Sequence, residues 1–89
     1  MSDTGVQIQV SQGVVRRHKG ISFGGSYAFP ATGSEAARIE IAVWEEGATE
    51  SEVSLCEGDT FEIAGQKWRL DKIHNEGQRR WYADLTRVA

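Results

Sequence analysis

Residues 60–88 carry a side-chain alternation that constrains the fold more than any other stretch of the chain. Phe61 and Ile63 alternate with polar or small residues, and so do Trp68 and Leu70 further along. A period of two residues is typical of a β-strand with one buried face. We therefore expect two antiparallel strands here, joined by a tight turn.

The expected turn has Gly65 and Gln66 as its two central residues. Gly65 can adopt the positive φ angle that a type II′ turn requires at its first central position. This register puts the apolar side chains on one face and charged side chains on the other. The predicted pairs are Ile63 with Trp68, Phe61 with Leu70, Glu62 with Arg69, and Asp59 with Lys72.

A third strand follows after a break in the alternation. Leu70 and Ile73 are three residues apart. A β-bulge at Asp71 or Lys72 would add one residue and restore the alternation. Residues 74–78 would reverse the chain, with Gly77 in a left-handed conformation. The predicted pairs are Ile73 with Trp81, Leu70 with Ala83, and Trp68 with Leu85.

The pattern G-D-T-F-x-I-x-G-x-x-W-x-L-x-x-I at 58–73, followed by W-x-x-x-L at 81–85, resembles small β-domains of unknown function from high-GC actinobacteria. The resemblance contains no catalytic motif, so it implies a fold and no activity. The spacing of its G-D pair, glycine and isoleucine is also similar to β-domains of secretion-system assembly proteins, which would imply protein–protein docking. From the sequence we expect neither the membrane anchor nor the signal that those proteins carry.

The N-terminal third predicts further strands. Residues 6–10 place Val6, Ile8 and Val10 on one face, and a turn at 11–13 leads into a short strand from residue 14. In 21–29, two adjacent glycines at 24 and 25 interrupt a series of large apolar residues. Glycines inside a strand predict a bulge or a close backbone approach.

Residues 38–46 form the clearest single strand, with Ile39, Ile41 and Val43 on one face and Trp44 on the other. A loop at 47–49 would join this strand to a second one at 51–56. The predicted pairs are Val43 with Val53, Ile41 with Leu55, Trp44 with Glu52, and Glu40 with Cys56.

These elements predict an all-β fold, a small antiparallel β-barrel or β-sandwich of six to eight short strands. We expect one domain over residues 1–89, with a loose N-terminus at 1–5, a flexible loop at 30–37 and room for a short helical turn near 34–37. The apolar fraction of 39% and the charged fraction of 26% fit a globular chain rather than a disordered one.

Several features favour a cytoplasmic location. No apolar run approaches the ~20 residues of a membrane span, and the N-terminus lacks the features of a secretory signal. The single cysteine cannot form an intrachain disulfide. The net charge is −3, and residues 35–62 hold nine acidic residues and one basic residue. A binder of duplex nucleic acid usually has a dominant basic footprint, so we expect none here.

Candidate chemistry is sparse. His18, His74 and Cys56 are far apart, without the paired spacing of zinc ligands, so we expect no metal and no cofactor. Cys56 is expected beside glutamates, where negative charge disfavours the reactive thiolate. Acid–base catalysis needs one carboxyl in an apolar setting and another in a polar one, and no such pair stands out. We therefore predict no catalytic residue, and a carboxylate-dependent enzyme is only a remote alternative.

The acidic strand pair is the expected binding surface. A tryptophan among glutamates is suited to a partner that carries Arg or Lys. We predict a non-enzymatic protein-interaction module that docks a basic partner. Two alternatives stay open: the strand lies inside a two-sided sheet, or residues 30–37 cover the tryptophan. The predicted partner-binding residues are Trp44, Glu40, Glu45, Glu46 and Glu52.

A second hypothesis is a small-molecule carrier or sensor with a ligand cavity lined by Phe23, Tyr27, Phe29 and Trp68. A homodimer through an edge strand is compatible with all three functions, the interaction module, the carrier or sensor, and the enzyme. The basic run at 16–19 and Arg79–Arg80 would form one basic patch if their strands were neighbours. We favour instead that these groups balance acidic residues across strands.

Overall fold

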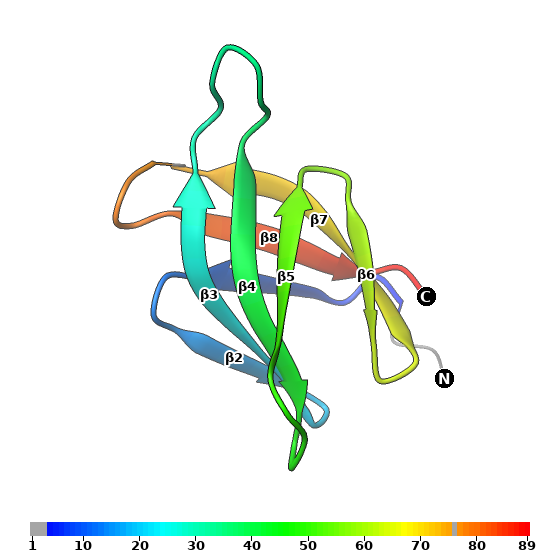
Figure 1. Cartoon of the computed structure of the whole chain (residues 1–89). Coiled ribbons are helices and arrows are strands. Elements are labelled where there is room, and N and C mark those ends of the chain that lie inside the picture. The colour runs from blue at the N-terminus through cyan, green and yellow to red at the C-terminus, as the bar shows by residue number, and fades with distance from the viewer. Residues whose placement is uncertain (1–3, 76) are drawn as a thin grey trace.

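The computed structural model describes residues 4–75 and 77–89, which form two stacked antiparallel sheets of four strands (Figure 1). The described residues contain no helix. One sheet has the order β1-β8-β7-β6 and the other β2-β3-β4-β5. The strands are β1 (Gln7–Ser11), β2 (Val15–His18), β3 (Ile21–Phe29), β4 (Arg38–Glu45), β5 (Ser51–Cys56), β6 (Thr60–Ile63), β7 (Gln66–His74) and β8 (Tyr82–Arg87).

This arrangement confirms the all-β prediction and selects the sandwich, because the two sheets are not closed into a barrel. In the part of the chain that the structure describes, nothing forms a helix long and apolar enough to cross a membrane. The predicted loose N-terminus lies partly outside the described residues, at 1–3. Residues 30–37 join β3 to β4 without forming a helical turn. The Thr32 side chain accepts hydrogen bonds from the backbone N–H groups of Ser34 and Glu35 there.

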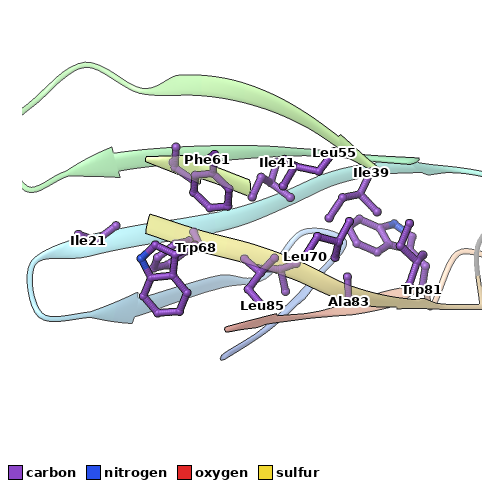
Figure 2. Packing of buried hydrophobic residues seen from close by; sticks show 14 residues of the cluster. Ile21, Ile39, Ile41, Leu55, Phe61, Trp68, Leu70, Trp81, Ala83 and Leu85 are labelled. Carbon is purple, nitrogen blue, oxygen red and sulfur yellow. The ribbon is translucent and has the colours of Figure 1, made fainter. Parts of the chain in front are cut away.

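The core fills the space between the sheets (Figure 2). Figure 2 shows Trp68 and Trp81 near opposite ends of this core, with Leu70 and Leu85 between them. The rings of Phe23 and Trp68 meet edge to face, with centroids 5.0 Å apart. Such contacts add about 0.5–1.5 kcal/mol to the stabilisation from burial. These aromatic side chains therefore join one sheet to the other.

The two sheets also meet through their backbones at Gly25 of β3. The N–H of Gly13 donates a hydrogen bond to the Gly25 carbonyl oxygen, 3.1 Å away. A Cβ atom built on Gly25 would lie 2.2 Å from the carbonyl oxygen of Ser11 and 3.0 Å from the Trp81 ring. This confirms the close backbone approach predicted for the glycine pair, because only glycine leaves enough room here.

A bulge follows directly, between Gly25 and Tyr27. It shifts the alternation of β3 by one residue. Ile21 and Phe23 are buried, whereas Tyr27 is 60% exposed and Phe29 is 37% exposed. All four residues have odd numbers, but the extra residue turns the second half of β3 over, so the bulge that the glycine pair also predicted is present.

The β6–β7 hairpin keeps its predicted faces but not its predicted turn. Ala64 and Gly65, with φ angles of 53° and 74°, are the central residues instead of Gly65 and Gln66. Positive φ at both central positions is the signature of a type I′ turn, which matches the twist of the flanking strands. Phe61 now pairs with Trp68, and Ile63 with Gln66. The predicted pairs are wrong by two residues, a shift that leaves each side chain on its face.

In the other two hairpins the observed pairing also differs from the predicted pairing by two residues. Between β7 and β8 the predicted bulge at Asp71 and the left-handed Gly77 (φ 80°) are confirmed. Between β4 and β5 the chain turns earlier than expected, because the N–H of Ala48 donates to the Glu45 carbonyl oxygen. The observed pairs are Ile73 with Ala83, Leu70 with Leu85, Trp68 with Arg87, Ile39 with Leu55, Ile41 with Val53, Ala42 with Glu52, and Arg38 with Cys56.

The predicted charge pairs change with the registers. Glu62 lies opposite Lys67 rather than Arg69, and Lys72 lies opposite Asp84 rather than Asp59. Arg69 pairs instead with Asp71 in the bulge, with 2.6 Å between Nε and Oδ1. Burial raises the pKa of Asp71, but hydrogen bonds from Thr86 and Arg69 and the charge of Arg69 outweigh it, so this pKa lies below its ordinary value.

We predict that Gly25→Ala destabilises the fold by about 2 kcal/mol or more, because the new Cβ overlaps the Ser11 carbonyl group. Urea denaturation of both proteins measures the difference. Gly33→Ala is the matched control, because a Cβ there meets nothing within 4 Å. Equal stabilities of the two variants would contradict the close approach.

A second prediction concerns Asp71. A carboxyl group with a lowered folded-state pKa stabilises the protein above its ordinary pKa of 3.8, and this contribution is lost as the pH falls from there through the lowered value. We expect Asp71→Asn to cost about 1 kcal/mol at pH 7, with the difference from wild type shrinking as the pH falls through this range. Urea melts at several pH values test this, and a pH-independent difference would argue against it.

Candidate functional site

Trp44 lies near the end of β4, on the outer face of the β2-β3-β4-β5 sheet. Its neighbour Val43 is buried in the core, and strand alternation turns the tryptophan the other way. A Cβ on Gly24 would contact its ring at 3.7 and 3.8 Å, so the indole packs over the space that this glycine leaves. The ring stays partly exposed. Residues 30–37 precede β4 and lie at its other end, so they do not cover Trp44 (Figure 1).

The Trp44 ring lines two hollows in the outer face, with volumes of about 230 and 240 Å³. The first hollow contains both a carboxylate and a guanidinium, from Glu46 and Arg17. The second is walled by small and apolar groups, including Val14, Val15 and Ala42. Of the described residues, Glu50 is the only charged one in its lining. An apolar hollow with one carboxylate is suited to a long side chain that ends in a positive charge.

The structure brings most of the predicted glutamates to this face. Strand alternation puts Glu40 and Glu52 on the same face of the sheet as Trp44, and Glu46 follows in the adjoining loop. Glu52 lies opposite Ala42, not opposite Trp44 as predicted. Glu45 alternates with Trp44 and lies opposite Ile21, so it belongs to the other face of the strand. Glu40 also lies 3.9 Å from an Arg38 nitrogen.

Sequence reasoning missed Glu50. It precedes β5, in the acidic segment between the two strands. The observed register places it near Trp44, whereas the predicted register placed Glu52 there. A hairpin turn centred one residue earlier shifts the pairing by two residues and would have identified it.

Two further aromatic side chains share the outer face. Tyr27 and Phe29 have ring centroids 6.2 Å apart, and the guanidinium carbon of Arg38 lies 4.1 Å from the centre of the Phe29 ring. Phe23 and Trp68, by contrast, are fully buried between the sheets. The four residues predicted to line a ligand cavity therefore lie on two different faces of the structure and do not enclose a common space.

The remaining candidate side chains are dispersed. The His18 ring meets the Trp68 ring edge to face, with centroids 5.8 Å apart. His74 Nε2 lies 2.9 Å from an Asp84 carboxylate oxygen. Cys56 lies opposite Arg38 rather than Glu40, which corrects its predicted surroundings. Among residues 4–75 and 77–89, no group of three or more His, Cys, Asp or Glu side chains is placed to hold a metal ion.

The two basic runs lie on different sheets. Arg16 and Arg17 belong to β2, which pairs with β3. Arg79 and Arg80 lie in the loop before β8, which pairs with β1 and β7. A single basic patch would require the two runs to lie on neighbouring strands, and they do not.

Comparison with known proteins places the chain in a family. No curated protein and no solved structure matches the sequence. A family of unknown function, DUF6406, matches residues 5–89. The expected likeness to β-domains of unknown function is thus confirmed at the level of the family, while an actinobacterial origin stays a prediction. Since the match covers almost the entire chain, the chain belongs to the DUF6406 family.

Proposed function

We propose that this protein is a non-enzymatic, cytoplasmic interaction module that docks a basic protein partner on the outer face around Trp44. The observation that carries the proposal is the hollow beside this tryptophan, which has apolar walls and, among the residues that the structure describes, Glu50 as its only charged lining residue. A lysine or arginine side chain of the partner would lay its stem against the indole and direct its charge to the carboxylate.

The energetics favour a cationic side chain at this position. A cation over an indole ring contributes about 0.5–1 kcal/mol when exposed and about 2 kcal/mol when desolvated. The surrounding carboxylates of Glu40, Glu46 and Glu52 would add long-range attraction, which mainly accelerates encounter. Arg17 and Arg38 lie on the same sheet, so the partner's charges must be positioned to avoid them.

The proposed interface extends beyond the tryptophan. A standard protein interface buries about 800 Å² on each partner, and the whole chain exposes 5491 Å². Such a contact would cover much of one sheet face. The exposed rings of Tyr27 and Phe29 belong to this face and supply further apolar contact area. Aromatic side chains of this kind are enriched in protein interfaces.

A capture experiment tests the proposal. The folded protein is immobilised, partners are captured from a lysate of the source organism at low and high salt, and the retained protein is then titrated in purified form. We expect a salt-sensitive complex that Trp44→Ala and Glu50→Lys each weaken at least tenfold, about 1.4 kcal/mol. Circular dichroism shows whether each variant stays folded.

Glu45→Lys is the matched control, because it makes the same charge reversal on the opposite face of β4. It should leave the affinity within about threefold of wild type, since a charge outside the interface changes mainly the encounter rate. Equal weakening by Glu45→Lys and Glu50→Lys would contradict the assignment to the outer face. A retained protein that turns out to be a second copy of this chain would replace the basic partner with a homodimer.

A further inference from the structure

A third hollow lies at one end of the other sheet, where β1, the β1–β2 turn and the β7–β8 loop meet. Its volume is about 290 Å³, just below the roughly 300–1000 Å³ typical of small-molecule sites. Figure 1 shows the β1–β2 turn and the β7–β8 loop on the same side of the molecule. Besides Trp81, six side chains line it: those of Gln9, Ser11, Gln12, Arg79, Arg80 and Tyr82.

Backbone hydrogen bonds fix the segments that line this hollow on both of its sides. Ser11 lies opposite Tyr82 in the β1–β8 ladder, so their side chains share one face of the sheet. The turn that contains Gln12 is fixed by the hydrogen bond from Gly13 to Gly25 and by a parallel bridge between Gln12 and Gly25. On the other side, the N–H of Gln78 donates to the Asn75 carbonyl oxygen, 3.0 Å away, within the β7–β8 loop.

The chemistry of the lining favours an anion. Each of the six side chains carries a hydrogen-bond donor, and the two guanidinium groups are permanently charged. Among residues 4–75 and 77–89, no acidic residue lines the hollow. Arg79 and Arg80 form no ion pair with any described residue. Within this part of the chain, no carboxylate would have to be displaced for a ligand to pair with them.

The acidic residue nearest in the ladder is already engaged. Asp84 lies opposite Gln9, whose side-chain N–H donates to its Oδ1 at 3.2 Å. The other carboxylate oxygen lies 2.9 Å from His74 Nε2. Lys72 lies opposite Asp84 on β7. The carboxylate is thus held among partners of its own sheet and does not supply a counter-ion for Arg79 and Arg80.

We propose that this hollow binds the phosphate group of a small phosphate monoester. The phosphate oxygens accept hydrogen bonds from several directions, whereas a carboxylate has two oxygens in one plane. The arginines would pair with the phosphate in bidentate geometry, while the hydroxyl and amide groups of β1, the turn and Tyr82 complete its shell. This site lies on the opposite sheet from Trp44 and does not depend on the proposed docking function.

Titration of the ¹⁵N-labelled protein with inorganic phosphate, followed by NMR, tests the proposal. Acetate and chloride at matched ionic strength are the comparison ligands. We expect saturable shifts at Gln9, Gln12 and Tyr82 with phosphate, and at least tenfold weaker binding of acetate. The double variant Arg79→Gln/Arg80→Gln should weaken phosphate binding at least tenfold.

Arg16→Gln/Arg17→Gln is the control, because it removes the same charge from β2, outside this hollow. It should leave the phosphate affinity within about threefold of wild type. Three results would each overturn the proposal: shifts that do not saturate, equal losses in the two double variants, or acetate binding as tightly as phosphate. Spectra of the free variants establish that each protein is folded.

Discussion

The pair Gly24–Gly25 in β3 is the constraint on which the rest of the structure depends. Without a side chain, Gly25 lets the end of β1 approach to contact distance, and this contact fixes one end of the sandwich. Gly24 points the other way and leaves the space that the Trp44 ring occupies. The same two residues therefore shape both the core and the outer face.

The bulge after Gly25 has a consequence for the surface. It turns Tyr27 and Phe29 out of the core and onto the face that carries Trp44. A regular strand would have buried these rings between the sheets, and the outer face would be mostly polar. The aromatic character of this face thus originates in a backbone irregularity rather than in the alternation of the sequence.

Much of the fold could be predicted because strand parity depends only on alternation. The inward positions of Ile39, Ile41 and Trp68 follow from a period of two, and the bulge at Asp71 follows from a visible break in that period. Register could not be predicted in the same way, because a shift of two residues preserves every face. The turns decide it, and the β6–β7 turn uses a non-glycine residue, Ala64, at positive φ.

The candidate site was predictable to the same extent. Parity placed Trp44, Glu40 and Glu52 on one face, whereas the error in register hid Glu50. The hollow at Arg79 and Arg80 could not be predicted from the sequence, because its lining comes from two segments that are far apart in the chain, 9–12 and 79–82. Only the ladder between β1 and β8 brings these segments together.

Hydrogen–deuterium exchange of the chain, alone and bound to its captured partner, tests the central claim most directly. The account predicts slower exchange in the loop at 46–50 and the adjoining end of β5 on binding, because these amides border the hollows beside Trp44. Exchange in the loop at 77–80 should not change. Protection confined to the β1-β8-β7-β6 sheet would contradict the assignment of the docking surface.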